Sequence, residues 1–289
     1  MDSKQTVLQK LNKKSISAKD IANQFWCEKQ MELYYTHPAK MTYAMEQGSA
    51  IHGKMQEEVY VPLTVEPTSW PDRLYKSAYE NLATLSTLLK DKLAREFKIY
   101  GSLHGYSVVG QIDELRMVNG KVTIVENKTT DPGRKLESEY IRPHVVQVML
   151  YRWLMDDIKN KQYQYQNFSI SYHSDTLKLS EKFIEGLNSI GVKEDLMTLN
   201  GIYNKMFNAV VALPELNNNL LVHYLDRRTR QSITEMNVPY DPKAMNKDII
   251  YAMKYWSGER EASPVPESEK WKCKICRFYG KECTAWWTG

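Results

Sequence analysis

Residues 106–128 read YSVVGQIDELRMVNGKVTIVENK, and this stretch decides the fold. Two runs rich in β-branched residues flank Asn119 and Gly120, and Asn-Gly is the preferred two-residue turn of a β-hairpin. Such a turn pairs Val118 with Lys121 and fixes the partner of every residue counted outward from it. The sequence therefore predicts a β-hairpin with a defined register.

The end of this hairpin far from its turn carries three ionisable side chains. Counting outward pairs Asp113 with Glu126, and the β-carbons of a directly opposed pair lie about 4.5–5.5 Å apart. Lys128 lies two residues beyond Glu126, so it projects from the same face. Opposed carboxylates repel one another, and a divalent cation with oxygen ligands offsets that repulsion. The pattern alone leaves a second interpretation open, an exposed hairpin with a cross-strand ladder of charges.

Two further pairs of residues have the spacing of one helical turn. Gly48 and His52 are four residues apart on a predicted helix, so the glycine allows close backbone approach and the histidine can bind a metal. Gln147 and Tyr151 have the same spacing and offer hydrogen bonds to phosphate or base. The alternatives are a surface histidine for His52 and a core side chain for Tyr151.

The four cysteines indicate a metal site. Cys273 and Cys276 have the spacing C-x2-C, Cys283 follows, and Cys27 stands near the N-terminus. Clustered cysteines in a reducing compartment indicate metal ligation more than disulfides. Their spacing suits either tetrahedral zinc or an iron–sulfur cluster. Either group would close a long loop and tie the two ends of the chain together.

Patterns outside the hairpin predict a mixed sheet flanked by helices, hence the α/β class. The sequence predicts one helix capped by Ser17 and another opened by Pro143. It predicts helices over residues 17–35, 42–60, 72–98, 143–159, 180–212 and 241–257, strands over 167–173, 219–225 and 231–238, and a linker over 261–269. The helical segment 180–212 is expected to be an insertion or cap that roofs the active site.

Composition excludes some classes of protein. The chain has 289 residues, 42% of them hydrophobic, which is an ordinary globular proportion. The net charge of +4 is too small to indicate a nucleic-acid partner by itself. No apolar run has the length of a membrane span, and the first residues, MDSKQTVLQKLNKKS, contain no apolar segment typical of a secretory signal. We expect an intracellular protein with no membrane partner.

The motifs together resemble one known family. The chain is similar to the RecB-type nucleases of the PD-(D/E)XK superfamily, in the branch with a [4Fe–4S] cluster that contains exonuclease V and the CRISPR-associated adaptation nucleases. The stretches VVGQIDEL and VQVMLYRWL are most similar to exonuclease V. The resemblance spans nearly the whole chain, and its motifs occur in order: Cys27, Gly48-x3-His52, Gly110-Gln-Ile-Asp113, Glu126-Asn-Lys128, Gln147-x3-Tyr151, and Cys273, Cys276 and Cys283.

The resemblance implies a role for each of these residues. His52, Asp113, Glu126 and the Asn127 carbonyl would bind Mg²⁺ or Mn²⁺. Lys128 would be the catalytic lysine, with Gln147 and Tyr151 supporting it. The resemblance also implies that the cysteines hold an iron–sulfur cluster rather than zinc. Asn127 departs from the family pattern, in which an apolar residue is usual, and it predicts that the adjoining strand is less buried.

The implied fold is a single restriction-endonuclease-like nuclease domain over residues 1–289. Its expected parts are a four-cysteine iron–sulfur clasp that joins the N- and C-terminal parts, a catalytic core, the helical insertion, and the remaining core strands and helix. These parts correspond to residues 1–41 with 260–289, 42–160, 180–212 and 213–259.

The implied function is a metal-dependent exonuclease for single-stranded DNA that digests from a free end in the 5′-to-3′ direction, in DNA repair or replication. A CRISPR adaptation nuclease that trims prespacers is the alternative within the same chemistry. A non-catalytic, zinc-clasped DNA-binding protein is the alternative of another class, although opposed carboxylates without metal would repel DNA. A single-strand-binding protein is a candidate protein partner.

Overall fold

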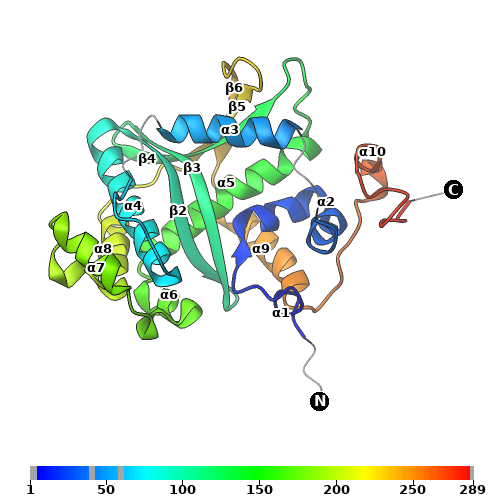
Figure 1. The fold of residues 1–289 in the computed structure, drawn as a ribbon. Helices are drawn as coiled ribbons and strands as arrows, with labels where there is room; N and C mark the ends of the chain where they lie inside the picture. The colour runs from blue at the N-terminus through cyan, green and yellow to red at the C-terminus, as the bar shows by residue number, and fades with distance from the viewer. Residues whose placement is uncertain (1–4, 39–42, 58–61, 287–289) are drawn as a thin grey trace.

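The computed structural model describes residues 5–38, 43–57 and 62–286 (Figure 1). Helices and strands alternate irregularly along the chain. The helices are α1 (Val7–Lys10), α2 (Ala18–Thr36), α3 (Tyr43–Glu57), α4 (Trp70–Asp91), α5 (Ser138–Lys159), α6 (Tyr165–Tyr172), α7 (Glu181–Ser189), α8 (Leu199–Val211), α9 (Pro242–Trp256) and α10 (Trp271–Lys274). The strands are β1 (Ile16–Ser17), β2 (Leu93–Leu103), β3 (Tyr106–Val118), β4 (Lys121–Thr130), β5 (Asn219–Asp226) and β6 (Ser232–Pro239).

The hairpin predicted at Asn119-Gly120 is the pair of strands β3 and β4. Both turn residues have positive φ, 50° and 77°, as this type of turn requires. The strands pair antiparallel from Val118–Lys121 to Glu114–Val125, which confirms the predicted register over that stretch. The next pair, Asp113 and Glu126, is not part of the recorded ladder.

The hairpin lies inside a mixed sheet. β2 pairs antiparallel with β3, β5 pairs parallel with β4, and β6 pairs antiparallel with β5. β3 extends beyond the residues that pair with β4. In that extension it pairs with the short parallel strand β1. The connection from β4 to the parallel strand β5 runs through α5, α6, α7 and α8. The predicted mixed α/β architecture, with a central sheet flanked by helices, is confirmed.

Helices cover both faces of the sheet. The Tyr100 hydroxyl of β2 lies 3.3 Å from the Ser77 hydroxyl of α4. A Cβ on the next residue, Gly101, would meet Leu154 of α5. Because successive residues of a strand point to opposite faces, α4 and α5 cover opposite faces. α2 and α9 pack against α5, and α3 crosses one end of the sheet (Figure 1).

Several boundaries predicted from the sequence are confirmed. Ser17 caps α2 by accepting a hydrogen bond from the Lys19 amide, as predicted. The strand pair β5–β6 and the helix α9 lie within one or two residues of their predicted limits. The predicted helix 42–60 is α3 over its described residues.

The prediction of one helix over residues 72–98 is wrong at its C-terminal end. α4 ends at Asp91, because Lys92 adopts a left-handed conformation with φ 65° and its amide bonds to the Leu88 carbonyl at 3.0 Å. The following residues form β2, an eleven-residue strand. Its backbone pairs with β3 along almost the whole strand, and this pairing is a long-range interaction that outweighs local helical propensity.

Two more predictions on secondary structure are wrong. Residues 167–173 lie mostly in α6 rather than in a strand, because a helix lets Phe168 and Tyr172, four residues apart, stack with ring centroids 4.5 Å apart. α5 begins at Ser138 and not at Pro143, which lies inside the helix. A proline there removes one backbone hydrogen bond, and the ring of Pro143 is buried.

The predicted helical insertion 180–212 consists of α7 and α8. α8 packs against α4, α5 and α6 and buries Tyr203 and Phe207. α7 and α8 lie beside α4, on the side of the molecule opposite α10 (Figure 1). This segment extends the hydrophobic core through the buried face of α8. A roof over the active site stays a prediction. None of the helices in the described ranges is both long and apolar enough to span a membrane.

Candidate active site and cysteine pocket

The candidate active site is built on the end of the β3–β4 hairpin. Asp113 comes from β3, and Glu126, Asn127 and Lys128 are consecutive in β4. Asp113 Oδ2 accepts a hydrogen bond of 2.7 Å from the Asn127 backbone amide. The backbone ladder between β3 and β4 ends just before this point, and the Asp113 carboxylate continues the connection between the two strands. It bonds to Asn127, which lies between Glu126 and Lys128.

Lys128 links the strand to α5. Its Nζ donates to Glu126 Oε1 at 2.5 Å and to Gln147 Oε1 at 3.0 Å. Gln147 in turn donates from Nε2 to the Tyr151 hydroxyl at 2.9 Å. Glu126, Gln147 and Tyr151 are 1%, 6% and 2% exposed, so this chain of hydrogen bonds is shielded from solvent. The structure therefore brings together five of the residues predicted for the site: Asp113, Glu126, Lys128, Gln147 and Tyr151.

Lys128 has charged partners in this site, whereas one oxygen of Glu126 has no hydrogen-bond partner among the described residues. Burial disfavours the Lys128 ammonium, but the carboxylates of Glu126 and Asp113 outweigh it and raise the pKa of Lys128 above its ordinary value. Lys128 is therefore charged at neutral pH. Glu126 Oε2 is buried and has no hydrogen-bond partner among the described residues. An unpartnered carboxylate oxygen in a buried site fits a cation ligand, since buried charges are normally paired or bound to metal.

His144 and Tyr224 are neighbours of Lys128 that the sequence analysis missed. Tyr224 of β5 is the register partner of Lys128, and its hydroxyl lies 2.9 Å from His144 Nδ1 of α5. Burial, together with the charge of Lys128, lowers the pKa of His144 to about 3. The imidazole is therefore neutral at physiological pH. The only sequence signal was that His144 stands three residues before Gln147 on the same helix.

Asn127 is buried, at 2% exposure, so the prediction of a less buried strand is wrong at this position. The side chain is satisfied instead by His223 of β5, whose Nδ1 lies 3.1 Å from Asn127 Oδ1. The other ring nitrogen of His223 lies 2.9 Å from the Ser232 hydroxyl at the start of β6. A polar side chain is tolerated here because the neighbouring strands supply its partner.

The helix α3 lies close to the end of β4. A Cβ on Gly48 would meet the Thr129 hydroxyl oxygen at 3.5 Å, which agrees with the predicted close approach at Gly48. His52 lies one turn later on the same helix. The side chain of His52, predicted as a metal ligand, lies outside the described part of the structure.

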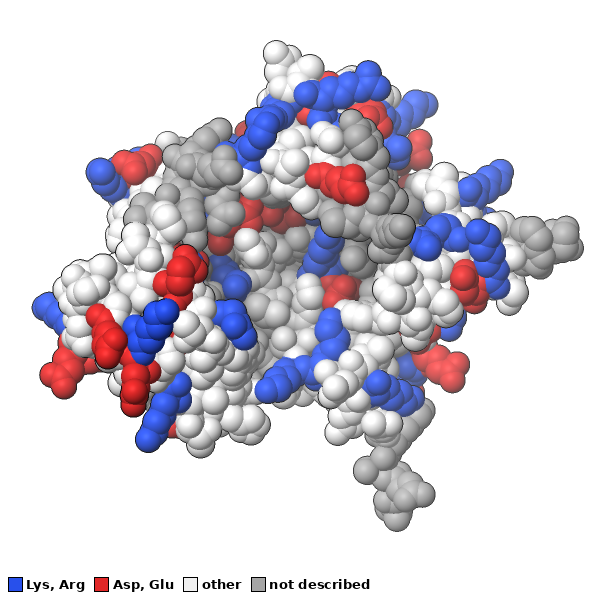
Figure 2. Space-filling view, viewed as in Figure 1, with Lys and Arg blue, Asp and Glu red and all other residues white. Residues whose placement is uncertain are grey.

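The face of the molecule that contains this region is hollowed. Figure 2 shows the hollow between α4 and α2, below α3, with Lys and Arg side chains around its rim. Acidic side chains are visible inside it, at the end below α3. A hollow with a cationic rim and an acidic interior can attract a polyanion and place a divalent cation within it.

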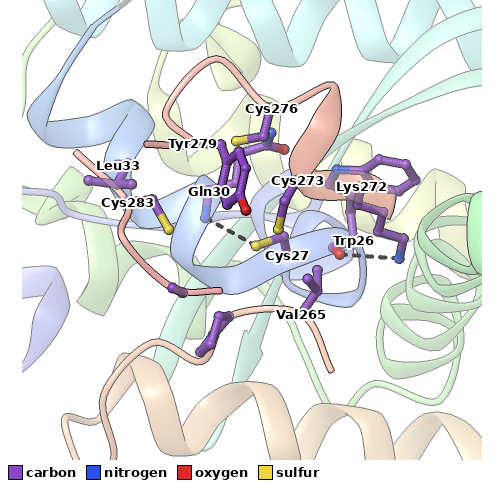
Figure 3. Close-up of a pocket in the computed structure, with 12 residues that line it drawn as sticks. Trp26, Cys27, Gln30, Leu33, Val265, Lys272, Cys273, Cys276, Tyr279 and Cys283 are labelled. Carbon is purple, nitrogen blue, oxygen red and sulfur yellow. Dashed lines mark hydrogen bonds between the residues drawn. The ribbon is translucent and has the colours of Figure 1, made fainter. Parts of the chain in front are cut away.

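The four cysteines line one pocket between α2 and the C-terminal segment. α2 is interrupted at Cys27, which has extended dihedral angles (φ −169°, ψ 112°) inside the helix. Gln30 donates from its backbone amide to Cys27 Sγ at 3.4 Å and from its side chain to Cys276 Sγ at 3.2 Å. Figure 3 shows the four sulfur atoms around a space that also holds the side chains of Gln30 and Tyr279.

The thiols have not formed disulfides, and burial raises the pKa of Cys27 and of Cys273, as do the neighbouring cysteines. A cation or cluster would reverse this effect, because metal ligation favours the thiolate. Over the described residues, no group of three or more His, Cys, Asp or Glu side chains is arranged so that it could hold a metal ion as it stands. The donor set of four sulfur atoms around one pocket nevertheless fits a sulfur-liganded group in its chemistry.

Protein contacts also join the two ends of the chain around this pocket. Glu28 of α2 forms an ion pair with Arg260 and accepts a hydrogen bond of 3.0 Å from the Ser263 amide. The Lys29 amide bonds to the Ser263 carbonyl at 3.1 Å, and Lys272 Nζ donates to the Trp26 carbonyl at 3.3 Å. The C-terminal segment is therefore held against α2 on both sides of Cys27.

Comparisons with known proteins agree over nearly the whole chain. The family model described as exonuclease V, a 5′ deoxyribonuclease, matches residues 5–121, 116–206 and 191–287. Exonuclease V of Danio rerio is 24% identical over 288 residues, which cover 94% of this chain and 70% of that protein. A crystal structure described as a candidate exonuclease from Eubacterium rectale aligns over 99% of this chain and 96% of its own, with 12% identity and a TM-score of 0.43. The family match includes the hairpin, α5 and all four cysteines.

Proposed function

The chain belongs to the exonuclease V family and is a DNA exonuclease, and from this premise we propose that it hydrolyses single-stranded DNA from a free 5′ end with a divalent cation at Asp113 and Glu126. The CRISPR adaptation nuclease is the less favoured candidate, because the family model and the curated relative are both exonuclease V. Membership in a family of enzymes also disfavours the non-catalytic DNA-binding protein.

One observation carries the proposed chemistry. The buried Glu126 divides its carboxylate between Lys128, bonded at Oε1, and an unpartnered Oε2. Asp113 lies beside the same strand, bonded to the Asn127 amide. A lysine next to two carboxylates, at the end of a hairpin packed on a helix, supports assignment to the PD-(D/E)XK nucleases. Mg²⁺ or Mn²⁺ suits this set of oxygen ligands, with His52 and the Asn127 carbonyl as further ligands implied by the resemblance.

Each residue of the site would have a different role in the hydrolysis. A cation bound at Asp113 and Glu126 would stabilise negative charge on the phosphate and lower the pKa of the attacking water. Lys128, charged and held by Gln147, can donate a hydrogen bond to a phosphate oxygen as charge develops on it. Tyr151 fixes Gln147 from the next turn of α5. Water oxygen bonds to phosphorus as it gives up a proton to solvent, the bond to the leaving sugar oxygen breaks, and that oxygen takes a proton from solvent to leave as a hydroxyl group.

The cysteine pocket is proposed to hold a [4Fe–4S] cluster on Cys27, Cys273, Cys276 and Cys283. Four thiols that line one pocket support a sulfur-liganded group, and the hydrogen bonds from Gln30 to two sulfurs are of the kind that tune such sites. The family resemblance favours iron–sulfur over zinc. A cluster in this position would stabilise the contact between α2 and the C-terminal segment.

Single-stranded DNA is the favoured substrate because of the hollow in Figure 2. Its cationic rim can follow a phosphate backbone, and binding to phosphates weakens as salt rises. A flexible strand reaches the floor of such a hollow more readily than a stiff duplex.

The test compares three substrates at equal Mg²⁺ concentration: an end-labelled linear single strand, the same strand circularised, and a blunt duplex. We expect rapid digestion of the linear strand, released from its 5′ end, and little digestion of the others. Chelation of the metal should abolish cleavage in every case. Digestion of the circle as fast as the linear strand would refute the need for an end, and faster digestion of the duplex would refute the preference for single strands.

A further inference from the structure

A row of five aromatic rings runs through the molecule from the active site to the cysteine pocket. Successive ring centroids lie 5.8, 5.5, 6.2 and 5.6 Å apart. The rings come from β5, α5, α2 and α10, and in order they are Tyr224, His144, Tyr140, Trp26 and Trp271. No local periodicity could produce this row, because its members are distributed over much of the chain.

The two ends of the row coincide with the two sites already described. Tyr224 is the register partner of Lys128 in the neighbouring strand. At the other end, Trp26 directly precedes Cys27, and Trp271 stands two residues before Cys273. Trp26 also lines the cysteine pocket (Figure 3). The row therefore connects the proposed site of hydrolysis with the proposed cluster.

Cationic groups accompany the rings. The guanidinium of Arg134 lies 5.2 Å from the Tyr140 ring centroid, and the ammonium of Lys272 lies 4.4 Å from that of Trp26. Lys272 is buried, forms an ion pair with Glu269 and packs against the Trp26 ring. Arg134, Lys274 and Arg277 are exposed and remain accessible to a polyanion. Residues 270–281 contain five basic and no acidic side chains.

Burial separates this row from an ordinary aromatic core. Trp271 is 36% exposed, and Ile275, one turn later in the same basic segment, is 66% exposed. Trp26 and Tyr140 are only partly buried. Exposed apolar side chains that adjoin one another among polar residues mark an interaction surface. Basic neighbours suit a ligand with both an apolar and an anionic part. Single-stranded nucleic acid has both, because its bases stack on rings and its phosphates pair with cations.

We propose that Tyr140, Trp26 and Trp271 form a stacking surface for unpaired DNA bases, along which the strand lies between the active site and the cysteine pocket. Arg134, Lys274 and Arg277 take its phosphates. The proposal rests on the proposed action on single-stranded DNA, and it assigns the cysteine-bearing segment a direct part in holding the substrate.

The test measures binding of a fluorescent oligo(dT) strand, without divalent cation so that it is not cleaved. Trp271→Ala should weaken binding about tenfold, since one base–aromatic stack accounts for a loss of that order. Trp271→Phe should restore most of the affinity because it restores a ring. Tyr251→Ala is the matched control: Tyr251 is 43% exposed, carries Arg260 over its ring at 4.1 Å and lies outside the row. It should bind DNA like the wild type.

A second strand of equal length, in which abasic sites replace the bases, separates stacking from a structural effect. Wild-type protein should bind the abasic strand more weakly than oligo(dT), and Trp271→Ala should cause no further loss with it. Equal losses on both strands would mean that the row only supports the fold, and no loss on either would mean that it receives something else, such as a segment of a protein. Either result overturns the proposal.

Two measurements keep the outcome clear. Iron content and thermal unfolding of each variant report whether the cysteine segment is intact. If Trp271→Ala does not fold, ultraviolet crosslinking of an iodouracil-containing strand to the wild-type protein replaces it, and crosslinks that map away from Trp26, Tyr140 and Trp271 would refute the stacking surface. Cleavage of single strands by the wild type tests the proposed function separately. Failure of the stacking surface can therefore be distinguished from failure of the proposed function.

Discussion

Lys128 is the residue on which the charges of the active site depend. From the sequence we expected the opposed carboxylates of Asp113 and Glu126 to repel one another until a cation offsets the repulsion. In the structure the ammonium of Lys128 already bonds to Glu126 at 2.5 Å, and both carboxylates raise its pKa. Lys128 therefore offsets part of the repulsion between the two carboxylates before any cation binds. Glu126 Oε2, which has no hydrogen-bond partner among the described residues, is the oxygen available to a cation.

We predict that Glu126→Gln lowers the rate of DNA cleavage at least about 100-fold, as loss of one preorganised electrostatic group does in other enzymes. The amide oxygen can still accept the hydrogen bond from Lys128, so the fold should survive. Glu126→Ala should lose activity as well, and it should also destabilise the protein by about 1–3 kcal/mol, because it leaves the partly buried ammonium of Lys128 without its carboxylate partner. Cleavage assays and urea unfolding measure the two effects.

Glu235→Gln is the control for this pair of variants. Glu235 lies on β6, is 39% exposed in its side chain and pairs with Arg116 away from Lys128. Its substitution should change neither cleavage nor stability by a large amount, because exposed ion pairs contribute little. A Glu126→Gln protein that cleaves DNA at the wild-type rate would contradict the assignment of Glu126 as a metal ligand.

At the scale of elements, the approach of α5 to β3 decides where Lys128 is held. Gly110 of β3 permits this approach, since a Cβ there would lie 2.6 Å from Tyr151 Cε1 and 3.0 Å from Ala18 Cβ. Tyr151 holds Gln147, and Gln147 holds Lys128. Gly110 of β3 thus makes room for Tyr151, and the hydrogen-bond chain from Tyr151 through Gln147 ends at Lys128 of β4.

We predict that Gly110→Ala destabilises the protein by about 1–3 kcal/mol, the usual cost of overpacking. It should also lower the cleavage rate of the folded protein, because Tyr151 must move away. Gly101→Ala offers a close comparison: its Cβ would lie 2.4 Å from Leu154 Cδ2 on the same helix, but Leu154 has no bond to the catalytic chain. The two variants should lose similar stability, yet only Gly110→Ala should lose activity at a temperature where both are folded. Equal activity of the two would argue against the positioning role of Tyr151.

The elements that the sequence predicted wrongly share one physical cause. Residues 93–98 continue a helical pattern but pair with β3, and residues 167–173 alternate like a strand but form α6. In α6, Phe168 also stacks on Tyr203 of α8 with ring centroids 4.0 Å apart. In both segments the local signal was ambiguous, and a partner distant in the sequence decided the conformation.

At the scale of the whole molecule, the cysteine pocket joins the ends of the chain. We predict that Cys27→Ser costs as much stability as Cys276→Ser, because either change would open the same clasp and release a long loop. Protein purified without oxygen should be brown and contain iron and acid-labile sulfide, and both variants should lose them. Thermal unfolding and metal analysis provide the measurements.

Glu28→Gln separates the cluster from the protein contacts around it. This variant weakens the pairing with Arg260 but leaves all four thiols in place. It should lose stability while keeping iron and sulfide. Stoichiometric zinc without sulfide in the wild-type protein would count against the iron–sulfur proposal, although not against the clasp itself.

The sequence by itself determined the features that depend on neighbours along the chain. Asn119-Gly120 determined the register of the hairpin as far as Glu114 and Val125, since a two-residue turn leaves one pairing. Just beyond that ladder, Asp113 bonds to the Asn127 amide, between Glu126 and Lys128. The spacing of one helical turn placed Gln147 with Tyr151 in the same way. Family resemblance, carried by motifs in order, supplied their roles.

Only the tertiary structure decided which distant segments meet. The bond from Lys128 to Gln147, the partner that His223 provides for Asn127, and the arrangement of Cys27 opposite the C-terminal cysteines all join separate elements. The position of residues 180–212 beside α4 depended on the same kind of contact. Local propensities are worth tenths of a kcal/mol per residue, whereas burial of a large side chain is worth about 1.5–3 kcal/mol, so packing between distant segments decides wherever the local signal is weak.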